Sequence, residues 1–337
     1  MADSQSPEAR ELSLIGKGEF RIAMADTDEK LQSLLGTYLP PLLLKLGSES
    51  VEGSNKIISV CQHINTRVKT PSIQLPVASL LKQFKEQNSQ LIRHFDLIYA
   101  QQGIDRLGSE ARVEILLPLL QGISKIGTSP TQGAIVFNLV LRLLPLLKLP
   151  AKGSEEDQQL KARLGLSDED SEFLSFWLAK LLLLTPGPKE TSTCPGLSPD
   201  EYSFLNKGAP ANETWNPSTD GGLNLTETKV TALRFIGSGA FKDPQRFLPS
   251  LIASADANSR LADLGDETLK RFTADIENSN VVQELYDLYF GSGGAPPARP
   301  PLQVKLLVFL GKSIKATANP QRVLRLIEDG LLSDSAR

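Results

Sequence analysis

The sequence contains very few of the residues that carry most enzyme chemistry. Its 337 residues include two histidines, His63 and His94, and two cysteines, Cys61 and Cys194. Two cysteines so far apart make neither a disulfide framework nor a zinc site, and they fit a reducing compartment. The scarcity of histidine argues against most histidine-dependent catalysis.

The chain also has no excess of positive charge. Lysine and arginine together number 36 and aspartate and glutamate 39, which gives a formal net charge of −3. Proteins that bind nucleic acid need a clustered basic excess to neutralise phosphates. We therefore expect no nucleic-acid partner.

Long uninterrupted apolar runs are missing as well. The two longest are Ile135–Leu149, which contains Arg142 and Lys148, and Phe173–Leu184, which contains Lys180. Both are too short and too interrupted to cross a bilayer, so we expect no membrane insertion.

The first six residues are polar and acidic. They have neither the basic region nor the apolar region of a secretion signal. With the reducing environment inferred from the cysteines, this predicts an intracellular protein, cytoplasmic and nuclear.

What the sequence does contain is a strong helical period. Apolar residues recur at spacings of three and four, which marks one buried face of an amphipathic helix, whereas alternating strand patterns are essentially missing. We expect an all-α chain of about 15 helices without a sheet. The clearest stripes are Ile57, Cys61, Ile64 and Val68; Val113, Leu116, Leu117 and Leu120; and Leu324, Ile327 and Leu331.

A Leu-Pro-x-Leu pattern occurs four times. A proline inside a helix removes one backbone hydrogen bond and bends the helix. A bent, leucine-rich helix followed by a short polar turn and an amphipathic helix is typical of a HEAT repeat. We therefore predict an α-α superhelix, an irregular HEAT/ARM-type solenoid. The pattern begins at Leu39, Leu117, Leu144 and Leu248.

Composition divides the chain into three parts. Residues 1–184 are expected to form N-terminal HEAT-like helical repeats, and residues 224–337 further repeats that continue beyond Arg337. Residues 185–223 between them are rich in Pro, Gly, Ser, Thr and Asn, with one short helix expected at Pro199–Leu205. They are predicted to be an irregular insertion that serves as a hinge or a binding loop.

The residue patterns assign no catalytic, cofactor-binding or metal-ligating residue. Cys61 lies in an apolar stripe and is expected to pack in the core. The glycines at 237–239 follow a helical stripe and lack the remainder of a phosphate-binding motif. Asp256–Glu267 has the length of a calcium loop, but Arg260 and Leu261 occupy positions that need a ligand and a glycine.

One polar stretch is the candidate protein-binding site. It runs from Asp256 to Arg260 and is extended by Lys270 and Arg271. Two interpretations are open. The stretch is either a structural turn in which Asp256 or Ser259 caps the next helix, which we favour, or an exposed ridge that contacts a partner. The candidate residues are Asp256, Asn258, Ser259, Arg260, Lys270 and Arg271.

Three stretches together resemble one family. The first includes Leu39–Leu46 and Ile73–Pro76; the second runs from Ala232 through Phe247–Pro249 to Ser254–Arg260 and Leu269–Arg271; the third includes Leu285–Gly291, Leu302–Lys305 and Ser313–Thr317. They resemble the N-terminal part of the extracellular-mutant-twenty-nine family of large HEAT-repeat proteasome adaptor and scaffold proteins.

The resemblance implies a function that the residue patterns alone do not. It implies an α-solenoid that associates with the regulatory and core particles of the 26S proteasome, stabilises or quality-controls their assembly, and uses no cofactor. The expected function is a non-enzymatic scaffold.

Two alternatives remain open. One is another HEAT-repeat scaffold, such as a transport receptor or a phosphatase scaffold. The other is a helical enzyme that uses acids such as Asp256, Asp263 and Asp266.

Overall fold

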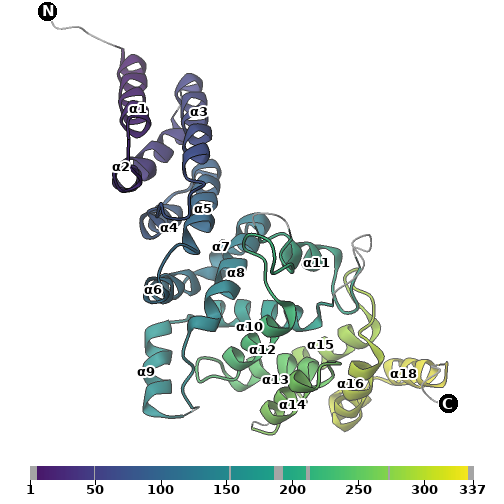
Figure 1. Ribbon diagram of the computed structural model, residues 1–337. Coiled ribbons are helices and arrows are strands. Elements are labelled where there is room, and N and C mark those ends of the chain that lie inside the picture. Colours follow the sequence, from purple (N-terminus) through teal and green to yellow (C-terminus); the bar gives the residue numbers. More distant parts are fainter. Residues whose placement is uncertain are drawn as a thin grey trace, which may run out of the picture. The chain divides into compact units, whose positions relative to one another are not determined.

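The computed structural model describes residues 6–48, 50–151, 153–185, 193–209, 213–271 and 274–332. Within these ranges the chain forms eighteen α-helices and two short 3-10 helices, and the only pairing of extended backbone is an isolated bridge between Cys194 and Leu197. The all-α prediction is confirmed (Figure 1). None of the helices in these ranges has both the length and the apolar character that a bilayer crossing demands.

The chain forms two compact units. The first covers residues 1–115 and the second residues 116–337, so the division falls inside helix α6 (Ser109–Leu120). The boundaries expected at 185 and 223 rest on composition, whereas the two units are defined by contacts in the structure. By contacts, residues 185–223 belong to the second unit.

The first unit is a series of helices joined by short connections. Helix α1 packs against α2 and α3, α4 packs against α5, and α2 contacts both α4 and α5. These elements are α1 (Pro7–Ala23), α2 (Asp28–Leu44), the 3-10 helix η1 (Lys45–Gly47), α3 (Val51–Arg67), α4 (Val77–Glu86) and α5 (Gln90–Ile104).

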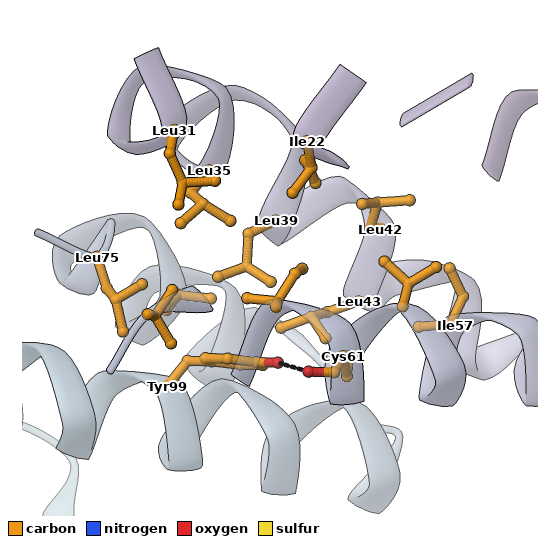
Figure 2. Packing of buried hydrophobic residues seen from close by; sticks show 14 of the residues in the cluster. Ile22, Leu31, Leu35, Leu39, Leu42, Leu43, Ile57, Cys61, Leu75 and Tyr99 are labelled. Atoms are coloured by element: carbon orange, nitrogen blue, oxygen red, sulfur yellow. Dashed lines mark hydrogen bonds between the residues drawn. The ribbon is translucent and has the colours of Figure 1, made fainter. Parts of the chain in front are cut away.

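The core of this unit is built from the predicted apolar stripes. Leu35, Leu39 and Leu43 of α2 are fully buried in one cluster with Ile57 and Cys61 of α3, and Figure 2 shows these side chains converging. The hydroxyl of Tyr99 donates a hydrogen bond of 3.2 Å to the Cys61 carbonyl. Cys61 therefore packs in the core, as its stripe predicts.

The Leu-Pro-x-Leu pattern lies inside helices at three of its four sites. Pro40 lies within α2, Pro118 within α6 and Pro249 within α13 (Asp243–Ser254). Pro145 is the exception, because α8 ends at Leu143 and the backbone tightens into the 3-10 helix η2 (Leu144–Leu146). There the proline follows a helix end, where the loss of an N–H costs little.

The second unit begins with a helical hairpin and continues as a layered helical array. Helix α10 contacts α7, α12 and α13, while α13 packs most extensively on α14 and also touches α16. The elements are α7 (Ile123–Ile126), α8 (Pro130–Leu143), α9 (Glu155–Leu164), α10 (Asp168–Leu183), α11 (Pro199–Asn206), α12 (Leu225–Ile236), α13, α14 (Ser259–Leu269), α15 (Ser279–Phe290), α16 (Pro300–Lys312), α17 (Ile314–Thr317) and α18 (Pro320–Leu332).

The described part of the 185–223 segment is anchored to this unit. The short helix expected at Pro199–Leu205 is present as α11, with a capping box between Ser198 and Glu201. Phe204 of α11 stacks on Trp177 of α10 with ring centroids 3.6 Å apart. Residues 186–192 and 210–212 of the predicted insertion lie outside the described residues.

Helices α13 and α14 approach each other unusually closely at Gly265. A Cβ at this position would lie 2.4 Å from the Ser254 backbone nitrogen and 2.9 Å from the Ser250 carbonyl oxygen. Glycine is therefore required there by backbone contact, although it is a poor helix former.

Basic side chains cap the carbonyl ends of neighbouring helices. The Arg67 guanidinium donates to the carbonyls of Ile22, Ala23 and Ala25 at the end of α1. Arg106 does the same for Val68 at the end of α3, at 2.7 Å. The last carbonyls of a helix have no partner inside it, so a neighbouring cation satisfies them and complements the helix dipole.

Acidic side chains cap the opposite ends. One oxygen of Asp170 accepts from the Gly122 N–H at 2.8 Å, and the other accepts from the Ser124 N–H at 3.0 Å, at the start of α7. Burial opposes ionisation of Asp170, but the N–H donors of Ser124 and Gly122 hold the pKa of its carboxyl below the ordinary value.

One buried carboxyl in the first unit is left only partly satisfied. Asp96 of α5 is fully buried, and one of its oxygens accepts from the Gln83 amide at 2.9 Å. The other oxygen has no hydrogen-bond partner among the described residues. Burial raises the pKa of Asp96 to about 7, although the Gln83 hydrogen bond acts in the opposite direction.

Asp96 should make the first unit less stable as the pH rises. Its carboxyl is easier to protonate in the folded chain, with a pKa of about 7 against an ordinary 3.8, so the folded state holds an extra proton between these values. The free energy of unfolding should therefore fall from about pH 4 to pH 7, by at most about 1.4 kcal/mol per pH unit.

The variant Asp96→Asn should flatten this dependence and should be more stable than wild type at pH 8. Urea unfolding at several pH values measures it. The exposed Asp263→Asn serves as control and should retain the wild-type profile. Parallel profiles for wild type and Asp96→Asn would contradict the assignment.

Candidate functional site

The structure places the predicted site residues at the two ends of one helix. Asp256 and Asn258 lie in the turn between α13 and α14, and Arg260 lies in the first turn of α14. Lys270 and Arg271 follow its last residue. Because α14 has 11 residues, about 15 Å of helix separates the two groups. They form two separate clusters and not one continuous ridge.

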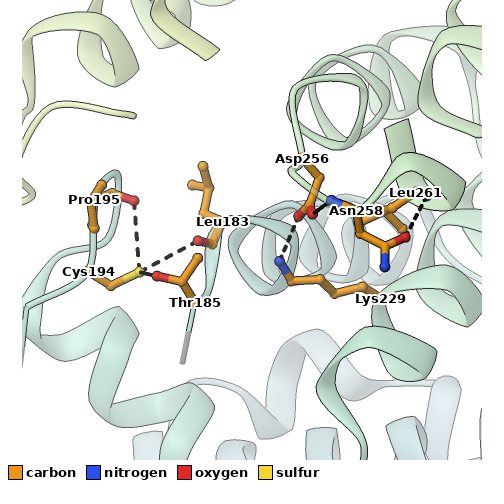
Figure 3. A network of polar contacts seen from close by, with 8 residues as sticks. All are labelled: Leu183, Thr185, Cys194, Pro195, Lys229, Asp256, Asn258 and Leu261. Atoms are coloured by element: carbon orange, nitrogen blue, oxygen red, sulfur yellow. Dashed lines mark hydrogen bonds and ion pairs between the residues drawn. The ribbon is translucent and has the colours of Figure 1, made fainter. Parts of the chain in front are cut away.

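Asp256 is part of a largely buried ion pair. Its carboxylate lies 3.1 Å from the ammonium of Lys229 on α12, and Lys229 is only 5% exposed. Burial lowers the pKa of Lys229, and the charge of Asp256 opposes this effect. Asp256 also accepts the Asn258 backbone N–H at 2.9 Å, so both of its oxygens have partners (Figure 3).

Asn258 is the residue that caps α14. Its side-chain oxygen accepts the Leu261 N–H at 3.2 Å, as Figure 3 shows. The expectation that Asp256 or Ser259 is the cap is wrong. Asn258 is the last residue with extended backbone, whereas Ser259 is already helical and Asp256 is held by Lys229. A cap must have non-helical backbone and a short acceptor side chain, which Asn258 combines.

The remaining charged residues of the predicted site lie on the surface. Arg260 pairs with Glu227 at 2.9 Å, and Arg271 pairs with Glu267 one helical turn earlier. The ammonium of Lys270 makes no ion pair with any described residue. Exposed pairs contribute little to stability, so these side chains can exchange their partners for those of another protein.

Two lysines that hold the turn together were not found from the sequence. Lys229 pairs with Asp256, and Lys305 of α16 donates to the Ser254 carbonyl at 2.7 Å and to Asp266 at 2.8 Å. Lys229 shares the helical spacing of Leu233 and Ile236, which are buried. A lysine in an apolar stripe is the signal that could have revealed it.

The three acids proposed for a helical enzyme have different partners. Asp256 is paired with Lys229 and Asp266 with Lys305, while Asp263 lies exposed on α14. In the part of the chain that the structure describes, no three His, Cys, Asp or Glu side chains gather closely enough to hold a metal ion.

The two cysteines are both buried. Burial raises the pKa of the Cys61 thiol to about 11. The Cys194 sulfur lies 3.5 Å from the Leu183 carbonyl oxygen and 3.5 Å from the Thr185 hydroxyl (Figure 3). A nucleophilic cysteine needs an accessible thiolate, whereas both of these thiols are buried.

Comparison with known proteins identifies relatives of the whole chain. The family described as "Proteasome component ECM29, N-terminal" matches residues 15–337. The chain is 30% identical to "Proteasome component ECM29" of Saccharomyces cerevisiae, over 97% of this chain and 18% of the yeast protein. No solved structure matches it.

Animal relatives are similar over most of the chain. The chain is 29% identical to "Proteasome-associated protein ECM29 homolog" of Drosophila melanogaster, over 92% of this chain and 16% of that protein. It is 25% identical to the human "Proteasome adapter and scaffold protein ECM29", over 86% of this chain and 17% of that protein. The chain thus spans less than a fifth of the length of these relatives, and the predicted family resemblance is confirmed.

The buried and the exposed charged residues near the start of α14 should respond differently to mutation. Asp256→Ala leaves the Lys229 ammonium buried without a partner and should lower the free energy of unfolding by about 3 kcal/mol. Arg260→Ala removes an exposed ion pair and should cost less than about 1 kcal/mol. Urea unfolding of both variants measures the difference. Equal losses would contradict the structural role assigned to Asp256.

Proposed function

The chain belongs to the family of proteasome component ECM29, as part of its N-terminal region, and from this premise we propose that it binds the 26S proteasome. It acts there as a non-enzymatic scaffold or adaptor. The single observation that carries the proposal is the family match over residues 15–337. The human relative is named as an adapter and scaffold protein, which supports the same role.

The architecture is suited to such a role. Several helices, such as α3 and α14, bury one face and leave the other exposed, so their outer surfaces are available for contact. In such a protein the binding free energy is spread over many contacts and does not depend on one deep catalytic pocket.

The surroundings of the potentially reactive side chains support a non-enzymatic role. Both cysteines are buried, and Asp256 and Asp266 are each held by a lysine. These residues are used to hold helices together. The surface residues Ser259, Arg260, Lys270 and Arg271 are proposed as contact residues for a charged partner.

We further propose that the chain contributes to stabilising or quality-controlling the assembly of the regulatory and core particles. A protein that binds both particles favours the assembled state, because it binds the complex more tightly than either part alone. The scaffold name of the human relative is consistent with this role.

Purified chain should co-migrate with purified 26S proteasome on a native gel, detected by blotting for the chain. High salt should abolish co-migration, because exposed charges contribute to the contact. Circular dichroism of the same sample establishes that the chain is folded. A folded helical sample that never co-migrates would contradict binding by this part of the protein.

The assembly role has its own measurement. Adding the chain to 26S proteasome under conditions that slowly separate the regulatory from the core particle should leave a larger fraction assembled after a fixed time. The double variant Arg260→Glu/Lys270→Glu, with an unchanged melting temperature, should protect less well. Protection equal to that of the wild-type chain would contradict the assignment of these two residues to the contact surface.

A further inference from the structure

A groove of about 790 Å³ lies within the second unit, between helices α10, α13 and α15. Its apolar lining comes from all three helices and includes Leu183, Leu248, Ile252 and Val281. Phe176 of α10 also faces it and is 47% exposed. Trp177 and Lys180 cover part of the Phe176 ring, and the exposed remainder offers an apolar contact in the groove.

The charge of the groove is strongly one-sided. Four acidic side chains line it, namely Glu172, Glu201, Glu284 and Asp287, whereas Lys180 is the only cation among its lining residues. Lys180 is already paired, because its ammonium lies 2.8 Å from Glu201 and 5.2 Å from the centre of the Phe176 ring. Three carboxylates are thus left without a neutralising cation in the groove.

Glu284 of α15 is an exposed acid that lines the groove. It makes no hydrogen bond or ion pair with any described residue. The surrounding protein removes part of its hydration and raises the pKa of its carboxyl; Lys180 opposes this effect and Asp287 adds to it. Glu284 is exposed, so an incoming cation can reach it, and the like charge of its neighbour Asp287 favours such a partner.

Apolar surface and acidic charge in one groove define the chemistry of an occupant. An apolar ligand alone would leave the acids unneutralised and less hydrated, and a small cation alone would leave Phe176 exposed. A short amphipathic segment with both apolar and basic side chains satisfies both. The volume of about 790 Å³ is large enough for several side chains.

We propose that this groove binds a basic amphipathic segment of a partner protein, with a lysine or arginine at Glu284 and an apolar side chain on Phe176. Where that partner is a proteasome subunit, the inference rests on the proposed function. The complementary charge gives specificity and speeds association, and the apolar contact supplies affinity.

The direct test uses a synthetic helical peptide of leucine and lysine with one apolar face, labelled for fluorescence anisotropy. Glu284→Lys should weaken its binding at least tenfold, and Glu284→Gln should weaken it less. The matched control is Glu328→Lys, an exposed glutamate on α18 that does not line the groove, which should bind like wild type. Equal binding by Glu284→Lys and Glu328→Lys would overturn the proposal.

The same variants on 26S proteasome separate this inference from the proposed function. Weaker co-migration of Glu284→Lys alone supports the groove as a proteasome contact. Failure of the wild-type chain to co-migrate would contradict the proposed function, while the peptide result would still decide the groove. If the wild-type chain self-associates and Glu284→Lys abolishes this, the occupant is a second copy and the proposal is wrong. Unchanged circular dichroism and melting temperature are required of each variant.

Discussion

Every helix end brings the same physical constraint to this chain: four backbone N–H groups at one end and four carbonyls at the other have no partner within the helix. Packing many short helices together covers many such ends, and a covered polar group without a hydrogen bond is costly. The chain solves this by sending charged side chains from one helix to the end of another. Arg67 and Arg106 reach carbonyls in the first unit, and Asp170 reaches N–H groups in the second.

This use of charge changes how the surface must be interpreted. A charged residue in a turn looks exposed in the sequence, yet Asp256 neutralises the buried Lys229, and Lys305 binds the end of α13. The same region holds the close contact between α13 and α14 at Gly265. The charges available to a partner are those that remain, such as Lys270 and Glu284.

The sequence predicted what depends on local pattern. Apolar spacing located many of the helices because one of their faces is buried, and three of the four Leu-Pro-x-Leu patterns lie inside helices. The sequence prediction was wrong at Pro145, which follows the end of a helix, and at the cap of α14, which is Asn258. In both places a shift of one or two residues decides which residue ends or begins the helix. The groove could not be predicted from the sequence. Its lining residues lie between Glu172 and Ala295, and residues so far apart in the chain become neighbours only in the folded structure.

The two uses of charge should also differ in their sensitivity to salt. At 0.1 M salt, the interaction between two exposed charges is largely screened beyond a distance of about 10 Å, whereas a buried ion pair is screened much less. Lys229 and Asp256 are 7% and 19% exposed in their side chains, whereas Arg260 and Glu227 are 53% and 60% exposed. Salt can therefore weaken the contact with a partner while the contacts between helices hold. For the proposed scaffold role, this difference means that salt would release a partner without unfolding the chain.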